Sequence, residues 1–297
     1  MNDRCNDNGE RLGPGQRLFV ALQYLLPQHL LSGVVFRLTR LRLGPVTSLL
    51  IRAFIWAFRV DMDEAMAPNP AAYPNFNAFF TRALREGART VDLAPNKVIS
   101  PVDGAVSQIG RIESGRLFQA KGRDFGCDEL LGGDRELAAC FDGGLFATLY
   151  LSPRDYHRIH MPLDGRLRST IHVPGRLFSV NPTTAAAVPR LFARNERLVC
   201  LFETALGPIA LVLVGAIFVG SIETTWSGRV TPPRGRSIKR TPADQAMVPF
   251  QRGAELGRFN MGSTVVVLLP PNTAVWNPEL APGTAVSCGR PLALALD

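Results

Sequence analysis

Residues 257–269 read Gly-Arg-Phe-Asn-Met-Gly-Ser-Thr-Val-Val-Val-Leu-Leu, and this stretch indicates the fold most directly. The uncharged run from Val265 to Leu269 is rich in β-branched side chains and ends at a proline, which is typical of a buried strand. Gly262 and Ser263 lie at the mouth of this strand. Glycine leaves its carbonyl carbon unhindered, and the next hydroxyl can attack that carbonyl to form an ester. Taken alone, a Gly-Ser-Thr tripeptide is most often a loop.

Short β-branched runs closed by Pro and Gly turns also follow one another upstream, at 98–106, 145–151, 167–173, 198–202 and 209–222. Gly207, Pro208, Gly215 and Gly220 interrupt the long uncharged run 204–222, so we expect two core strands there and not a membrane helix. Short helices are expected within 75–84, 128–131 and 182–191. The pattern predicts an α+β fold with a mainly antiparallel β-sheet core.

Composition excludes several classes of protein. The 297 residues are 46% hydrophobic and 20% charged, which excludes a disordered chain and is enough for a full core. The five cysteines are scattered and show no Cys-x-x-Cys spacing, so a disulfide framework and a zinc cluster are not indicated, and a reducing compartment is expected. There is no G-x-G-x-x-G or Walker motif for a nucleotide cofactor.

The net charge of +8 is unevenly distributed along the chain. Residues 11–60 contain seven arginines and no acidic residue, interleaved with apolar side chains and divided by Pro27 and Pro45. No piece provides the roughly 20 apolar residues of a spanning helix. Amphipathic helices of this composition lie in a membrane interface, so we expect 11–60 to be a membrane-associating arm, with an ordinary helical subdomain as the alternative.

The remaining boundaries follow from the same charge pattern. Residues 1–10 form a polar, acidic tail that fits a secretory signal poorly, and we expect 61–297 to form one domain that carries the candidate catalytic residues discussed next. A second stretch free of acidic residues, 224–243, carries five cations and is expected to be a Pro/Gly loop. The charge pattern lacks the compact basic domain and the recognition motif expected for nucleic-acid binding.

Two of the four histidines, His157 and His160, crowd into the segment Tyr150-Leu-Ser-Pro-Arg-Asp-Tyr-His-Arg-Ile-His-Met-Pro162. They point the same way on a helical turn and opposite ways on a strand. Histidine is the natural base near neutral pH, although two polar turn histidines are the plainer interpretation. No third ligand with zinc-like spacing is evident, so no metal is expected. Asp103 lies in Ser100-Pro-Val-Asp-Gly104, which by itself predicts a turn.

Together these segments resemble the phosphatidylserine decarboxylase family, in its pyruvoyl-dependent, prokaryotic type I form. The resemblance covers nearly the whole chain and is most specific in the long histidine segment and in Arg-Asn-Glu-Arg197. Further matching segments are Phe76–Phe80 with Arg82, Pro101–Gly104, Gln119–Gly122, Pro174–Asn181, Val214–Ile222, Thr231–Arg234 and Met261–Thr264. Met261 stands where the bacterial form usually has Leu, a change that conserves volume.

The resemblance implies a cofactor that the chain makes from itself. Asp103 would orient His160, and His160 would take the hydroxyl proton of Ser263 as Ser263 attacks the Gly262 carbonyl. The chain would be cut between 262 and 263 into a β chain, 1–262, and an α chain, 263–297, that starts with a pyruvoyl group derived from Ser263.

The implied activity is that of a carbon-carbon lyase. Phosphatidylserine would form an imine with the pyruvoyl group and leave as phosphatidylethanolamine after losing CO2. By the same resemblance, His157 would position the carboxylate or return the proton. Ser179 and Asn181 are candidate pocket residues for the substrate.

The expected partners are phosphatidylserine, an anionic lipid surface and a second copy of the chain in a homodimer. The expected location is the cytoplasmic face of the cell membrane, as a peripheral protein. Two alternatives remain. A serine hydrolase could use Asp103, His160 and Ser263 as a triad, although the G-x-S-x-G elbow is missing. A non-catalytic basic lipid-binding module could retain the same motif without cutting itself.

Overall fold

The computed structural model describes residues 13–218, 221–232, 237–243 and 248–296, so the expected tail 1–10 lies outside the described residues. Its centre is a nine-stranded sheet with the order β12-β7-β8-β9-β15-β5-β2-β17, and β13 pairs with β7 beside β12. The strand pairs of this sheet are antiparallel. The predicted α+β class with a mainly antiparallel core is therefore confirmed.

Strand β15 (Ser263–Leu269) lies in the middle of this sheet and every residue in it is buried. It pairs with β5 (Leu145–Leu151) on one side and β9 (Gly207–Val214) on the other. Apolar side chains on both faces of β15 explain why the run from Val265 to Leu269 shows no alternation with polar residues. The prediction of a core strand here is confirmed.

The uncharged run 204–222 contributes β9 and the start of β10 (Ser221–Thr224), which confirms that strands and not a helix form there. The loop prediction for 224–243 was wrong in part, because β11 (Gly228–Thr231) and β12 (Lys239–Pro242) lie within it. All four β12 residues are exposed, and β12 pairs along the outer edge of β7 (Gly165–Val173). Charged side chains are common on such edges, and their sequence carries no apolar signal.

The other strands complete three smaller sheets and the flanks of the large one. A four-stranded sheet has the order β11-β10-β14-β6, a three-stranded sheet the order β1-β18-β16, and β3 pairs with β4. Their bounds are β1 (Lys97–Ile99), β2 (Gly104–Arg111), β3 (Arg116–Ala120), β4 (Arg123–Gly126), β6 (Arg158–His160), β8 (Arg197–Thr204), β13 (Pro249–Phe250), β14 (Glu255–Asn260), β16 (Ala274–Trp276), β17 (Ala285–Val286) and β18 (Pro291–Ala295).

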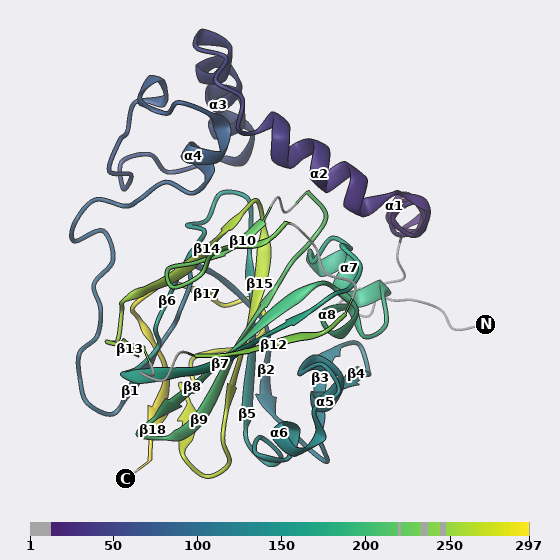
Figure 1. The fold of residues 1–297 in the computed structure, drawn as a ribbon, viewed down its shortest axis with the longest axis vertical. Coiled ribbons are helices and arrows are strands. Elements are labelled where there is room, and N and C mark those ends of the chain that lie inside the picture. The colour runs from purple at the N-terminus through teal and green to yellow at the C-terminus, as the bar shows by residue number, and fades with distance from the viewer. Residues whose placement is uncertain (1–12, 219–220, 233–236, 244–247, 297) are drawn as a thin grey trace.

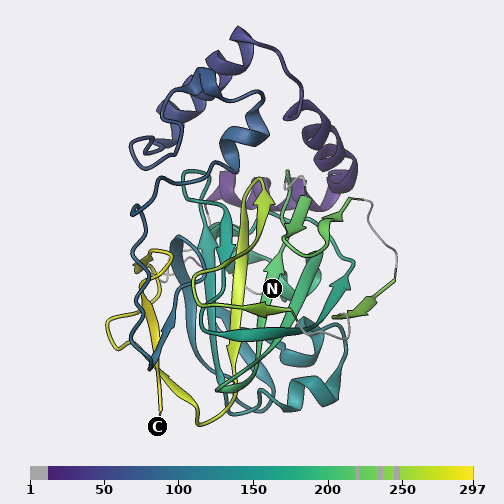
Figure 2. The ribbon, with the colours of Figure 1, turned by 60° about the vertical axis from the view of Figure 1, so that its left-hand side comes forward.

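Three helices cover one end of the sheets, as Figures 1 and 2 show from two directions. They are α1 (Pro14–Leu25), α2 (Gln28–Leu38) and α3 (Pro45–Phe58), and they break where Pro27 and Pro45 predicted. Among the described helices none is by itself long and apolar enough to cross a bilayer. The pair α1 and α2 reaches that length and composition only together, across a bend of 90°.

These helices expose many large apolar side chains and bury several polar ones. Leu25 and Trp56 are 81% and 84% exposed, whereas Gln23, Gln28 and Ser32 are buried. Further exposed apolar side chains of this region are Leu18, Phe19, Leu22, Leu26, Leu30, Val34, Leu38, Leu41, Leu43, Val46, Leu49, Leu50 and Phe58. An apolar surface of this extent marks a region that contacts another apolar phase or partner.

Short helices fill the connections between the strands. Helix α4 (Phe76–Phe80) packs under α3, where the rings of Phe54 and Phe76 meet edge to face with their centroids 5.1 Å apart. Of the expected helices, the one within 75–84 is shorter, the one at 128–131 starts one residue earlier, and the one at 182–191 is divided into two. The bounds of the remaining helices are η1 (Pro70–Ala72, a 3-10 turn), α5 (Cys127–Leu130), α6 (Arg135–Ala139), α7 (Pro182–Ala187) and α8 (Leu191–Arg194).

Candidate functional site

Ser263 is the first residue of β15, and its side chain is fully buried. Its Oγ atom has no hydrogen-bond partner among the described residues. The two residues before it have unusual backbones, with φ of 93° at Met261 and 45° at Gly262. A positive φ at Met261 costs on the order of 1–3 kcal/mol, so the backbone is strained next to the Gly262–Ser263 bond.

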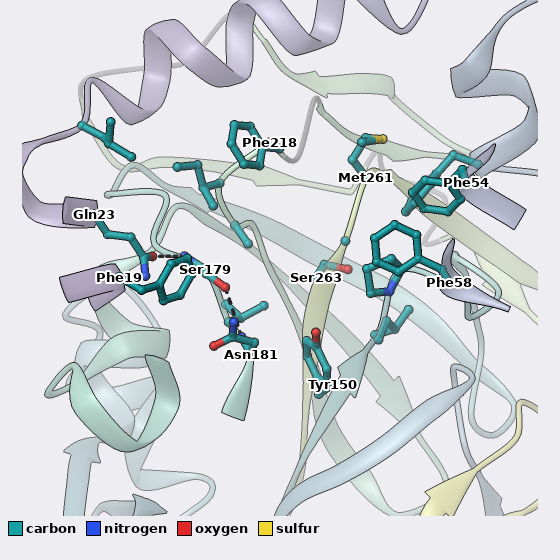
Figure 3. Close-up of a pocket in the computed structure, with 18 of the residues that line it drawn as sticks. Phe19, Gln23, Phe54, Phe58, Tyr150, Ser179, Asn181, Phe218, Met261 and Ser263 are labelled. Carbon is teal, nitrogen blue, oxygen red and sulfur yellow. Dashed lines mark hydrogen bonds between the residues drawn. The ribbon is translucent and has the colours of Figure 1, made fainter. Parts of the chain in front are cut away.

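A cavity of about 410 Å³ opens onto this bond, and Figure 3 shows Ser263 facing into it between Tyr150 and Met261. Its walls are mostly apolar. They come from α1, α3, α4, β5, the loops 179–181 and 216–218, and the segment 261–263. No Lys, Arg, Asp, Glu or His lines this cavity among the described residues.

The structure places the candidate pocket residues Ser179 and Asn181 in the same cavity as Ser263. Asn181 precedes α7, and its Oδ1 accepts a hydrogen bond from the backbone N–H of Thr184 at 2.9 Å. This bond caps the helix start, which is why Asn is favoured there. Sequence reasoning missed Gln23, which lines the cavity from α1 and accepts a hydrogen bond from the Ser179 N–H at 2.7 Å.

His160 ends β6, which pairs with β14, the strand that leads into Met261 and Gly262. Its Nδ1 atom lies 2.7 Å from the carbonyl oxygen of Gly253, and its Nε2 atom lies 3.0 Å from the hydroxyl of Tyr156. Burial is the largest influence on the ring and lowers its pKa below the usual value. His160 is therefore held as a neutral imidazole.

Asp103 precedes β2 and is bound by other partners. The Arg89 guanidinium donates to its carboxylate, with Nε 2.9 Å from Oδ1, and the backbone N–H of Cys288 donates at 2.8 Å. Glu64 accepts two hydrogen bonds from the same guanidinium at 2.8 Å. No hydrogen bond joins the side chains of Asp103 and His160 in the described chain. The two segments meet through the backbone, where the His160 N–H donates to the Pro101 carbonyl at 2.8 Å.

His157 lies in the turn between β5 and β6 and is only 1% exposed. Its Nδ1 donates to the Asp155 carbonyl at 2.7 Å, and its Nε2 is buried without a partner among the described residues. The Phe80 ring, which lines the Ser263 cavity, packs on the imidazole with centroids 4.2 Å apart. Burial, followed by the nearby Arg82 charge, lowers the pKa of His157 to about 3, against an opposing hydrogen bond to Asp155.

The structure thus brings Gly262, Ser263, Ser179 and Asn181 together around one cavity. Asp103 lines a second, polar cavity of about 260 Å³, together with Arg89, Tyr156 and other charged side chains. His160 bonds to Tyr156 of that second cavity. The direct contacts of a Ser-His-Asp triad are not formed, so the triad stays a prediction.

Sequence reasoning also missed Arg89 and Tyr156. Tyr156 lies inside the histidine segment and could have been found there, whereas the position of Arg89 shows no local signal. The described residues contain no group of three or more His, Cys, Asp or Glu side chains placed to hold a metal ion. The chemistry available at the site is that of a buried hydroxyl, a strained peptide and two neutral imidazoles.

Comparison with known proteins identifies relatives across the whole fold. A family model described as phosphatidylserine decarboxylase matches residues 76–294, and a second model, described as PSD, matches residues 18–59. The first match covers the sheets, and the second covers most of α1 to α3.

Several curated proteins are similar over nearly their entire length, and each is called a phosphatidylserine decarboxylase proenzyme. The Azotobacter vinelandii protein is 56% identical over 94% of this chain and 98% of its own. The Stutzerimonas stutzeri protein is 54% identical over 94% and 95%, and the Methylococcus capsulatus protein is 54% identical over 93% and 96%.

Proposed function

The chain belongs to the phosphatidylserine decarboxylase family, and from this membership we propose that it is a carboxy-lyase that converts phosphatidylserine to phosphatidylethanolamine and CO2. The relatives are proenzymes, so the chain is expected to mature by cutting itself. Family membership favours this reaction over a serine hydrolase or a non-catalytic lipid-binding module.

The proposal rests on one observation, the unpartnered hydroxyl and the strained backbone at the Gly262–Ser263 bond. The Ser263 hydroxyl is buried without a hydrogen-bond partner in the described chain, and the preceding Met261 has a strained backbone. A buried hydroxyl without a partner is costly to keep, which supports a chemical role for it. Attack by Ser263 Oγ on the Gly262 carbonyl would break the peptide bond, form an ester and relieve the strained backbone. Elimination would then release 1–262 as a carboxylate and leave a dehydroalanine at 263, which water converts to the pyruvoyl group with loss of ammonia.

His160 is the proposed base for this cut. Its Nε2 carries the lone pair that could take the Ser263 proton, once the Tyr156 hydroxyl gives up its bond to that atom. Asp103 is proposed to fix the environment of His160 through the Pro101–His160 backbone contact. We therefore propose Asp103, His160 and Ser263 as the self-cleavage residues. Asp103 would act on His160 without a direct contact between the two side chains.

The pyruvoyl group derived from Ser263, once formed, supplies a carbonyl that condenses with the substrate amine and takes up the electrons that remain when CO2 leaves. The apolar cavity fits this role, because a carboxylate that lacks a cationic partner is poorly solvated there. Ser179 and Asn181 are proposed to contact the headgroup. His157, whose Nε2 has no partner among the described residues, is proposed to position the substrate carboxylate or to return the proton that replaces CO2.

The arm 11–60 is proposed to bind the membrane through the exposed apolar side chains of α1 to α3. Arg37, Arg52 and Arg59 are exposed there and would attract anionic lipid. We propose that the protein is peripheral and acts at the cytoplasmic face of the cell membrane. The homodimer stays a prediction, which light scattering of the purified protein would test.

The function is tested by incubating the purified, matured protein with phosphatidylserine in detergent micelles. We expect CO2 and phosphatidylethanolamine in equal amounts, and neither product from Ser263→Ala. The His157→Ala variant should be cut normally but decarboxylate slowly. A fully active His157→Ala enzyme would remove His157 from the mechanism.

A further inference from the structure

Two of the three buried polar side chains of α1 and α2 bind the wall of the Ser263 cavity, and the third binds Leu177, close in the chain to that wall. Gln23 Oε1 accepts a hydrogen bond from the Ser179 N–H at 2.7 Å, and Gln28 Oε1 accepts one from the Leu177 N–H at 2.9 Å. Ser32 Oγ accepts one from the Phe218 N–H at 3.1 Å. The donor in each bond is a backbone group of a loop that strands of the sheet do not hold.

The hydrogen bonds to Ser179 and Phe218 hold part of the cavity wall in place. Ser179 and Phe218 both line the cavity. Asn195 holds Phe178 through two hydrogen bonds and Asn181 caps α7, whereas the backbone N–H of Ser179 between them donates to Gln23. A buried backbone N–H that loses its acceptor is costly, so the loop would shift to find another partner. The shape of the cavity therefore depends on side chains that belong to the arm.

Gln23 has the central place among the three. It is 2% exposed and lines the cavity itself. Its Nε2 donates to Thr184 Oγ1 at 3.3 Å, and its backbone carbonyl accepts a hydrogen bond from Gln28 Nε2 at 2.7 Å. Leu25, two residues later on the same helix, is largely exposed. One helix thus presents an apolar face outward and a hydrogen-bonding face to the cavity.

We propose that Gln23 is a positioning residue for the decarboxylation, which holds the Ser179 to Asn181 wall in the shape that receives the lipid headgroup. This inference rests on the proposed function, because the substrate it concerns is the phosphoserine headgroup. Through Gln23, α1 and the substrate cavity form one unit, so the part of the chain with the exposed apolar face also sets the geometry of the pocket.

The proposal predicts an effect on substrate binding and none on self-cleavage. Ser263 is held by β15 between β5 and β9, and Gln23 contacts none of these strands through a hydrogen bond. Gln23→Met keeps the side-chain length and removes both hydrogen bonds. We expect normal cutting at 262–263, a KM for phosphatidylserine in mixed micelles raised about tenfold, and kcat changed much less.

Gln16→Met is the matched control, because it makes the same exchange on the same helix. The Gln16 side chain accepts a hydrogen bond from the Gly13 N–H at the start of α1, and Gln16 does not line the cavity. We expect a wild-type KM for this variant. An equal rise in KM for both variants would mean that any loosening of α1 has this effect, and would overturn the specific role of Gln23.

Thr184→Val provides a second test at a residue that does not itself line the cavity. It removes the acceptor of Gln23 Nε2 with little change in volume, so KM should rise in the same direction by a smaller factor. The KM of the double variant should be no higher than that of Gln23→Met alone, because both substitutions remove the Gln23–Thr184 hydrogen bond. Multiplied effects in the double variant would show that the two residues act independently and would contradict the proposal.

The decisive experiment measures cutting, KM, kcat and vesicle binding for the wild type and these variants. A raised KM with normal cutting and normal binding to vesicles of phosphatidylglycerol and phosphatidylcholine supports the proposal. A wild-type KM for Gln23→Met, or a loss of vesicle binding by the same factor, overturns it. If Gln23→Met does not fold, the KM of Thr184→Val decides. A wild-type protein that is uncut or makes no phosphatidylethanolamine would instead defeat the proposed function.

Discussion

The Nδ1 atom of His160 lies 2.7 Å from the carbonyl oxygen of Gly253. A carbonyl oxygen can only accept a hydrogen bond, so Nδ1 carries the proton in the neutral ring and Nε2 presents its lone pair. The Tyr156 hydroxyl, 3.0 Å from Nε2, then donates to that lone pair. The backbone of Gly253 thus selects the tautomer of His160 that can act as a base at Nε2.

The first prediction concerns this lone pair. His160→Ala should slow the cut between 262 and 263 by about 100-fold or more, because a positioned base contributes that much. Tyr156→Phe should be cut at least as fast as the wild type, since it frees the lone pair while Gly253 still orients the ring. Both rates are measured by gel after a pulse of synthesis. A normally cut His160→Ala protein would show that another group is the base.

The second prediction concerns the ion pair of Arg89 and Asp103. The Asp103 side chain is 9% exposed, so removal of its cation leaves a nearly buried charge unpaired. Arg89→Gln should lower the free energy of unfolding by about 3 kcal/mol, the low end for a buried ion pair, because the Arg89 side chain is partly exposed. Adding Asp103→Asn should restore much of this loss. Urea denaturation of the uncut Ser263→Ala chain provides the measurement, and simple addition of the two losses would contradict the pairing.

The third prediction is a pH dependence of stability. The pKa of His157 is about 3 in the folded chain and 6.5 when the group is unperturbed. Between pH 3 and 6.5 the unfolded chain therefore binds more protons than the folded chain. The contribution of His157 to the free energy of unfolding is fully present above pH 6.5 and is lost progressively as the pH falls from 6.5 towards 3. His157 should contribute a loss of up to about 1.4 kcal/mol for each pH unit.

The check compares urea unfolding at pH 7, 6 and 5 for Ser263→Ala with and without His157→Gln. His160, whose pKa is also lowered, adds a slope of the same sign to both proteins. The His157→Gln protein should lose less stability on acidification. Parallel profiles would mean that His157 is not the buried neutral group described above.

The fourth prediction concerns the exposed apolar surface of the arm. Leu25→Ser and Trp56→Ser should each weaken binding to anionic vesicles roughly tenfold, as expected for loss of a large apolar side chain. Leu93→Ser is the control, because Leu93 is 75% exposed but lies outside the arm. Vesicle co-sedimentation measures all three. Equal losses for the three variants would argue against a specific role for the arm.

The electrostatic part of membrane binding needs a separate set of variants. Replacing Arg37, Arg52 and Arg59 by Gln should weaken binding at low salt and have less effect at high salt. Arg40 is left out, because it donates to Ser221 and lies 3.7 Å from Glu223 in an ion pair that joins the arm to β10. A salt-independent loss would indicate damage to the fold.

Local patterns in the sequence predicted a large part of this fold. Pro27 and Pro45 divide the arm where the helices break, and the run from Val265 to Leu269 is the central strand. Both signals are local, since proline ends a helix and an uninterrupted β-branched run marks a buried strand. Ser179 and Asn181 were reached only through the family resemblance, and they do lie in the cavity with Ser263.

The parts that were not predicted depend on contacts between distant segments. Arg89 and Asp103 lie 14 residues apart on either side of β1, and no local pattern around either residue predicts that they pair. In the sequence, Gln23 resembles any polar residue on the outer face of an amphipathic helix. It is buried because α1 packs against the segment that contains Ser179. β12 forms because an edge strand offers unpaired backbone groups, which leave no pattern in the side chains.

The central claim is that Ser263 breaks the chain at its own amino side, and intact-mass analysis of the purified protein tests it most directly. We predict two chains, 1–262 and 263–297, the second beginning with a pyruvoyl group in place of serine. Ser263→Ala should give one chain of full mass. An active wild-type protein with a single uncut chain, or a cut that persists in Ser263→Ala, would contradict the account.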